Sequence, residues 1–153
     1  MALAKLCTFP TCKTVVRDGS HRCINHRQAK RTQEAVDRSQ FYKTTSWRKL
    51  SLLKRKEHPI CELCNKELVA DVDHWLELLL DTEQTYALDP RNLVSTCKSC
   101  HLQKSAKVRQ MLRHPHKNNI IYQWCINNHP RKEDIGYLHQ WVQQLKVNNE
   151  ELS

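Results

Sequence analysis

The chain has 153 residues, with 25 Lys or Arg against 16 Asp or Glu, and a formal net charge of +9. This surplus on a chain long enough for one compact domain plus appendages favours a polyanionic partner, because basic side chains neutralise phosphates. No apolar run approaches the roughly 20 residues that span a bilayer, and the N-terminus lacks the apolar core of a secretory signal. We therefore expect a soluble, cytoplasmic protein without a membrane partner.

Residues 1–26 form the first predicted element, a segment rich in cysteine and histidine. Its spacing, C-x4-C followed by C-x2-H, allows three sulfurs and one nitrogen to converge on one ion. We predict a structural zinc site in this segment, with His21 as an alternative to the last ligand. The four predicted ligands are Cys7, Cys12, Cys23 and His26.

Residues 27–40 are polar and lack Pro and Gly, which fits a solvated helix and a loose linker equally well. A helix is expected next, capped by Thr45 or Ser46 and ended at His58-Pro59, since the residue before proline leaves the helical region. Its apolar stripe is predicted to comprise Trp47, Leu50, Leu53 and also Leu52. Its remaining surface is basic, from Arg48, Lys49, Lys54, Arg55 and Lys56, and is either a nucleic-acid grip or a solvated face.

Two C-x2-C pairs stand on either side of the middle of the chain. Two residues between thiolates allow one tight turn to direct both sulfurs at one ion, and two such turns complete a tetrahedral site. We predict that the pairs share one structural zinc ion, because four thiolates leave no coordination position open. The predicted ligands are Cys61, Cys64, Cys97 and Cys100.

Short strands and a helix are predicted around the second pair. Residues 68–74 alternate apolar and polar side chains as a strand does, and residues 93–96 fit a second short strand, with 75–91 as the connection. A helix is expected from about Ser99 to Leu112.

The remaining segment, 113–153, is predicted to form two amphipathic helices, the second capped by Asp134. Cys125 falls on the apolar face of the first of these helices, where a buried, inert thiol is expected. We expect the pair to pack on the rest of the protein, with docking or dimerisation as the alternative.

Four polar residues between and just after the cysteine pairs are candidates for chemistry: Asp73, His74, Asn92 and His101. Each alone has an ordinary structural explanation. A shared zinc ion would, however, bring the end of the first strand close to the helix that begins near His101. A carboxylate and two imidazoles beside a basic surface suit metal-assisted cleavage of a phosphodiester. Neighbouring residues on a strand point to opposite faces, so Asp73 and His74 can reach one ion together only where the strand ends or bulges.

These residues resemble the HNH endonucleases, which have the ββα-metal fold. The similarity runs from about Phe41 to Lys107. Within it lie the segments Ser46-Trp47-Arg48-Lys49-Leu50, Pro59-Ile60-Cys61-Glu62-Leu63-Cys64, Val72-Asp73-His74, Asp89-Pro90-Arg91-Asn92-Leu93 and Cys97-Lys98-Ser99-Cys100-His101, followed by Lys104. Many similar proteins are encoded by phages or prophages, and some act beside the DNA-packaging terminase. The segment after His74, Trp-Leu-Glu-Leu, departs from the usual family pattern.

The resemblance implies a role for each matching residue in a one-metal mechanism. Asp73 and His101 would hold a single divalent ion, which is Mg²⁺, Mn²⁺, Ni²⁺ or Zn²⁺. His74 would be the general base. Asn92 would fix the backbone so that His74 points correctly, and Lys104 is a candidate to contact the scissile phosphate. The products would be a 5′-phosphate and a 3′-hydroxyl.

We therefore predict an α+β protein with four parts: an N-terminal zinc-binding cluster (1–26), a linker or solvated helix (27–40), an HNH nuclease core (41–112) and a C-terminal helical extension (113–153). The predicted function is metal-dependent cleavage of DNA. The alternatives are a non-catalytic zinc module that binds DNA or docks a protein, and a nuclease acting on RNA. Expected partners are DNA and, as options, a phage terminase or a second copy of the chain.

Overall fold

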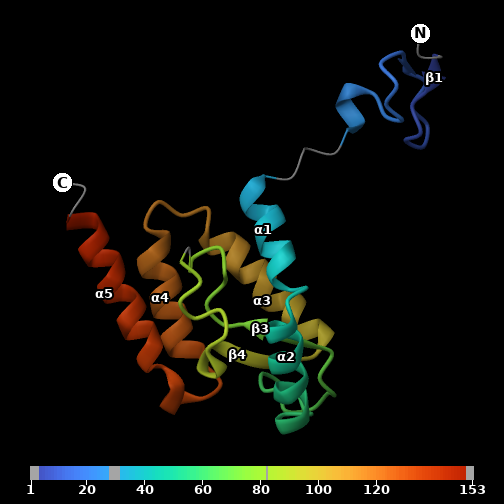
Figure 1. The fold of residues 1–153 in the computed structure, drawn as a ribbon. Coiled ribbons are helices and arrows are strands. Elements are labelled where there is room, and N and C mark those ends of the chain that lie inside the picture. Colours follow the sequence, from blue (N-terminus) through green and yellow to red (C-terminus); the bar gives the residue numbers. More distant parts are fainter. Residues whose placement is uncertain (1–3, 28–31, 82, 151–153) are drawn as a thin grey trace. The chain divides into compact units, whose positions relative to one another are not determined.

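The computed structural model describes residues 4–27, 32–81 and 83–150. Contacts divide the chain into two compact units, residues 1–36 and 37–153, and each unit is described by itself. Figure 1 shows the elements of both units. No helix among the described residues is long and apolar enough to cross a membrane.

The first unit contains a two-stranded antiparallel sheet of β1 (Lys5–Leu6) and β2 (Val15–Val16). A short 3-10 turn, η1 (Ile24–His26), follows the sheet. The buried cluster of this unit is small and consists of Cys7, Val16 and Cys23, with Cys12 packed against it. Two of these three buried residues are cysteines, so the described residues of the unit form almost no apolar core apart from the sulfurs.

Helix α1 (Gln33–Phe41) occupies part of the segment for which helix and linker were both expected. Helix α2 (Thr45–Glu57) is capped by Thr44, whose side chain accepts a hydrogen bond from the Trp47 backbone N–H, and not by either of the two residues predicted. The helix ends before His58-Pro59, as predicted.

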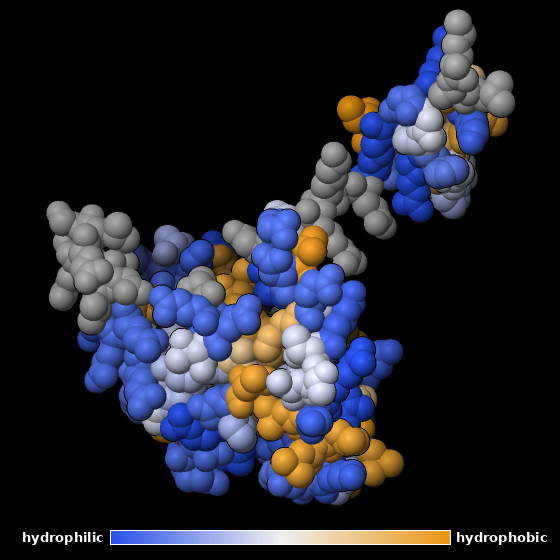
Figure 2. All heavy atoms as spheres, in the orientation of Figure 1, coloured by the Kyte–Doolittle hydropathy of each residue, from blue (hydrophilic) through white to orange (hydrophobic). Residues whose placement is uncertain are grey.

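The predicted apolar stripe of α2 was wrong at two positions. Leu52 and Leu53 are 56% and 51% exposed, whereas Lys54 is buried. At 100° per residue, Leu53 lies about 120° from Trp47, whereas Lys54 lies almost directly below it and faces the sheet. Figure 2 shows apolar side chains gathered on the surface over α2 and the segment after it, where the exposed hydrophobic residues are Leu52, Leu53, Ile60 and Leu68.

The second unit is built on an antiparallel pair, β3 (Asp71–His74) and β4 (Leu93–Thr96), in which His74 lies opposite Leu93. The first strand is shorter than predicted, because Leu68 forms only an isolated bridge to Ile60. The connection between the strands ends in a 3-10 turn, η2 (Pro90–Asn92). This connection is more than a surface loop, since several of its side chains are buried in the main core.

Three helices complete the unit: α3 (Lys98–Met111), α4 (Lys117–Asn128) and α5 (Gly136–Glu150), the last preceded by the 3-10 turn η3 (Lys132–Asp134). Helix α4 packs between α3 and α5 (Figure 1). The main core comprises Trp75, Leu76, Tyr86, Val94, Val108, Met111, Ile121, Cys125, Tyr137, Leu138 and Trp141. Cys125 is buried as predicted, and burial raises the pKa of its thiol to about 12.

Asp134 does not have the position expected for a cap. It ends η3, two residues before α5 begins, and its carboxylate accepts a hydrogen bond from the guanidinium of Arg131. The chain makes one more turn there than the sequence pattern indicates.

Candidate active site

The candidate site lies where the end of β3 meets α3. Asp73 and His74 point to opposite faces of the sheet, as strand geometry requires. The carboxylate of Asp73 faces α3, where it contacts Lys104, whereas the ring of His74 stacks on Trp47 of α2 at a centroid distance of 4.7 Å. Asp73 therefore faces α3 and His74 faces α2, on opposite sides of the same strand end.

On the α3 side, Asp73 and His101 offer one carboxylate oxygen and one imidazole nitrogen. Asp73 Oδ2 is 4.0 Å from His101 Nε2, and the other ring nitrogen of His101 is 3.5 Å from Asp71 Oδ2. An ion bound at about 2.0–2.2 Å from each donor fits a gap of this width. Asp71 turns His101 so that Nε2 faces Asp73, in the manner of carboxylates behind metal-binding histidines. Sequence reasoning missed Asp71, although strand alternation puts it on the same face as Asp73.

Lys104 is buried beneath these groups, and its charge points inward. Its ammonium donates to Asp73 Oδ2 at 2.9 Å, to the His74 carbonyl at 2.6 Å and to Glu77 Oε1 at 2.7 Å. Burial alone would lower the pKa of Lys104, but the two carboxylates raise it above its ordinary value. Glu77, which the sequence reasoning did not select, comes from the segment that departs from the family pattern. The predicted contact between Lys104 and a phosphate stays a prediction.

On the α2 side, His74 is held by one hydrogen bond. Its Nε2 is 2.8 Å from the Ala87 carbonyl oxygen, which can only accept, so the proton is on Nε2 and Nδ1 carries a free lone pair. Nδ1 is buried and has no hydrogen-bond partner in the described structure. The rings of Phe41, Tyr42 and Trp47 cover the imidazole, and burial lowers its pKa, which keeps it neutral.

Asn92 is fully buried and clamps the backbone just after His74. Its Oδ1 accepts from the Leu76 N–H at 2.7 Å, and its Nδ2 donates to the carbonyls of Leu76 at 3.1 Å and Tyr86 at 3.3 Å. Its own carbonyl accepts from the Trp75 N–H at 2.7 Å. These bonds tie the chain leaving β3 to the turn that enters β4.

The two C-x2-C pairs meet in one cluster, and their four sulfur atoms lie within 4.8 Å of one another, so the cluster could hold a metal ion: Cys61, Cys64, Cys97 and Cys100. Cys97 is also the N-cap of α3, where its sulfur accepts from the Cys100 N–H at 3.4 Å. The cluster therefore defines the start of the helix that carries His101 and Lys104.

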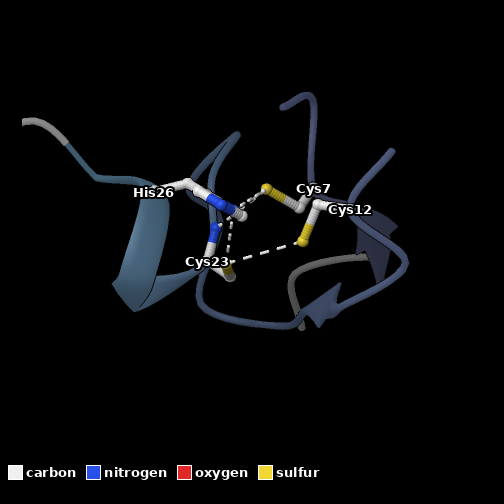
Figure 3. Close-up of side chains that lie close together, drawn as sticks. All are labelled: Cys7, Cys12, Cys23 and His26. Carbon is white, nitrogen blue, oxygen red and sulfur yellow. Dashed lines mark hydrogen bonds between the residues drawn. The ribbon is translucent and has the colours of Figure 1, made fainter. Parts of the chain in front are cut away.

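A second cluster lies in the first unit, where Figure 3 shows three cysteines and a histidine pointing toward one another. His26 Nδ1 is 3.3 Å from the sulfur of Cys23 and 3.6 Å from that of Cys7. The ring of Phe9 stacks on His26 at a centroid distance of 4.0 Å. The predicted ligands Cys7, Cys12, Cys23 and His26 converge, and His26 rather than His21 completes the set, which could also hold a metal ion.

An antiparallel pair of strands, a following helix and a carboxylate–imidazole pair between them define an α+β domain with an HNH-like fold. The family model described as HNH endonuclease matches residues 61–107. This segment, which is less than half of the chain, is therefore similar to the HNH endonuclease family, as the sequence resemblance predicts. The match is thus to a family of enzymes.

One solved structure also resembles the chain, a crystal structure of the HNH endonuclease of the deep-sea thermophilic bacteriophage GVE2 with manganese ion. It is 27% identical, covers 52% of this chain and 97% of its own, and superposes with a TM-score of 0.45. No curated protein matches the chain.

Proposed function

We propose that the protein is a metal-dependent endonuclease that hydrolyses phosphodiester bonds in DNA, leaving a 5′-phosphate and a 3′-hydroxyl. The observation that carries the proposal is the state of His74. Its imidazole is neutral, its tautomer is set by the Ala87 carbonyl, and its free Nδ1 lies at the strand end that also holds Asp73. A neutral imidazole with one nitrogen anchored and the other without a hydrogen bond is suited to general-base catalysis once a water molecule reaches it.

In this proposal His74 Nδ1 accepts the proton of the attacking water. Asp73 and His101 would hold one divalent ion, Mg²⁺, Mn²⁺, Ni²⁺ or Zn²⁺, and that ion would stabilise charge on the phosphate and the leaving 3′ oxygen. Asp71 keeps His101 Nε2 directed at Asp73, and Asn92 holds the backbone that orients His74.

The attacking water can reach His74 Nδ1 only if its cover opens, because this buried atom is covered by aromatic rings. Tyr42 is 43% exposed, whereas Trp47 is 7% exposed, so Tyr42 is the outermost part of this cover. The proposal therefore requires the substrate to displace Tyr42, while Trp47 stays stacked on the imidazole.

Zinc is the metal that we assign to both cysteine clusters, because thiolate and imidazole donors at these spacings suit a closed tetrahedral site. DNA is the proposed partner, in keeping with the net charge of +9. One site per chain would nick one strand, and a second copy of the chain is one way to cut both. A phage terminase is the other proposed partner.

The direct test is to incubate supercoiled plasmid with purified protein and Mg²⁺, Mn²⁺ or Ni²⁺, with bound zinc measured in parallel. His74→Ala should lower the cleavage rate at least about 100-fold, and omission of the added ion should abolish cleavage. His114→Ala, an exposed histidine in the turn before α4, is the matched control and should cut normally.

Two other outcomes would point elsewhere. Folded, zinc-loaded protein that binds the plasmid but never cuts with any ion would support the non-catalytic binding module. Faster cleavage of an RNA of the same sequence would assign the activity to RNA.

A further inference from the structure

A groove of about 280 Å³, with an apolar floor and one polar wall, opens beside the candidate active site, between α1 and α3. Its floor is apolar, formed by leucines of the segment after β3 and by side chains of α3. Its polar wall consists of Arg38, Tyr42, Glu77, Ser105 and Arg109. None of the residues on this wall is assigned a role in the proposed chemistry, apart from the displaced Tyr42.

The groove adjoins the catalytic groups on both sides of β3. Glu77 accepts a hydrogen bond from Lys104, which is bound in turn to Asp73. The ring of Tyr42 is 5.9 Å from that of His74, so Tyr42 is a wall shared by the groove and the proposed general base. A DNA strand bound in the groove would therefore contact Tyr42, the residue that the substrate must displace.

The groove also continues the face of α3 that begins with His101. His101, Ser105 and Arg109 follow one another at four-residue intervals, which puts them on one side of the helix. Each interval corresponds to about 6 Å along the axis, so Arg109 is about 12 Å from His101. At a rise of about 3.4 Å per nucleotide, this distance spans roughly four nucleotides of one strand.

The charge of the groove is positive. Among the described residues, neither Arg38 nor Arg109 forms an ion pair, whereas Glu77 pairs with Lys104, which it shares with Asp73. The groove therefore has two arginines against one glutamate on its wall. The Tyr42 and Ser105 hydroxyls add two neutral donors. Burial, together with the carboxylates of Asp73 and Glu77, raises the pKa of Tyr42 to about 12, so this hydroxyl keeps its proton.

We infer that this groove binds backbone phosphates of the cleaved strand on one side of the scissile bond, through the guanidinium groups of Arg38 and Arg109. Guanidinium groups bind phosphate oxygens in a bidentate manner, and two of them on separate helices would hold the strand in register with His101. The inference rests on the proposed function, because it names the part of the substrate held next to that site.

The first experiment measures binding of a labelled duplex without added divalent ion, as a function of salt. The double variant Arg38→Ala/Arg109→Ala should bind the duplex about 10-fold more weakly. The slope of the logarithm of the binding constant against the logarithm of the salt concentration should become shallower by about 2, because each lost phosphate contact contributes about 0.9. Arg38→Lys/Arg109→Lys keeps both charges and should keep most of the slope. Arg113→Ala, an exposed arginine just beyond α3, is the control for loss of one surface charge.

The second experiment replaces single phosphates of the cleaved strand by neutral methylphosphonates and compares cleavage by the wild type and the alanine double variant. Within about four nucleotides of the cut, on one side only, the replacement should slow the wild type and have no further effect on the variant. Additive effects at every position would overturn the inference.

The failures of the two proposals are distinguishable. If the protein cuts but the double variant binds with the affinity and salt slope of Arg113→Ala, the groove inference is wrong and the nuclease stands. If the protein never cuts, the nuclease proposal is wrong, and the binding measurement alone decides whether the groove holds phosphates. Thermal unfolding of each variant shows that the comparison is made between folded proteins.

Discussion

The two cysteine clusters use similar ligands in very different surroundings. Cys61 and Cys97 are buried inside the second unit, beside the sheet and at the cap of α3. The cluster around Cys23 lies in a unit whose buried core is little more than the ligands themselves. The second unit, by contrast, has an extended apolar core of its own.

This difference in the surrounding core implies that the metal has a different structural role in each unit. In the first unit the metal would replace a hydrophobic core, since a segment this small buries too little apolar surface to fold alone. In the second unit the core can hold the chain together, and the cluster positions the start of α3 relative to β3. Loss of the metal is therefore expected to unfold the first unit, but to disturb the active-site geometry of the second.

The largest effect is expected from Cys97→Ser. Serine can still cap α3, so its effect reports on the loss of the metal ligand. We expect the second unit to lose stability but to stay folded on its apolar core, and cleavage to fall about 100-fold or more, because His101 is displaced. Zinc content, urea unfolding and plasmid cleavage measure the three effects.

The matched control is Cys125→Ala, which removes a buried thiol that belongs to neither cluster. It should keep full zinc content and cleave normally, even though some stability is lost. Normal cleavage by a Cys97→Ser protein with one zinc fewer would contradict the role of the cluster in positioning α3.

Cys23→Ser should act as strongly, but only locally. Residues 4–27 should lose their folded amide resonances in an NMR spectrum, because Cys23 is both a ligand and one of three buried residues there. The unfolding of the second unit should change by no more than about 0.5 kcal/mol, as for distant, independent sites. A large shift of that transition would mean that the two units stabilise each other.

Much of this contrast follows from the sequence, because ligand spacing alone predicts both clusters, and alternation predicts the strands between them. The sequence was less informative about charged side chains whose ion-pair partner is distant along the chain. Lys54 was expected on the basic surface of its helix, but it is buried because Glu62, beyond the helix, supplies a carboxylate. Glu77 was missed because nothing local distinguishes it from a solvated acid, and its partner Lys104 lies on another element.

Glu62, a buried carboxylate, gives the second unit a pH dependence of its own. Burial alone would raise the pKa of Glu62, but the Ser95 N–H, Lys54 and Arg131 lower it below its ordinary value of 4.5. Its stabilisation is therefore complete above that value and is lost as the pH falls through the lower pKa of the folded state. Glu62→Gln should cost about 3 kcal/mol at pH 7.

The measurement is urea unfolding of the wild type and Glu62→Gln at a series of pH values. Both proteins carry the same cysteines, so release of zinc by acid affects them alike, and the difference isolates Glu62. The gap between them should close as the pH falls below about 4.5. A gap that stays constant down to pH 3 would mean that Glu62 acts by shape and not by charge.

The smallest effect is expected from Phe9→Ala in the first unit. The Phe9 ring lies parallel to that of His26, with 6° between the planes, and it is 42% exposed. It contributes no ligand, so its loss removes only the stacking that holds the imidazole in position, worth about 1 kcal/mol. The cluster should then bind its metal roughly 5-fold more weakly, at about 1.4 kcal/mol per tenfold.

Substitution with cobalt makes this effect measurable at each cluster, because a site with three sulfurs and one nitrogen and a site with four sulfurs absorb differently. Competition with a chelator should show weaker binding at the first cluster and unchanged binding at the second. Phe9→Tyr keeps the stacked ring and should bind as the wild type does. Equal affinities for Phe9→Ala and Phe9→Tyr would show that three thiolates and a histidine suffice to hold the metal, even where the described residues bury as little as they do here.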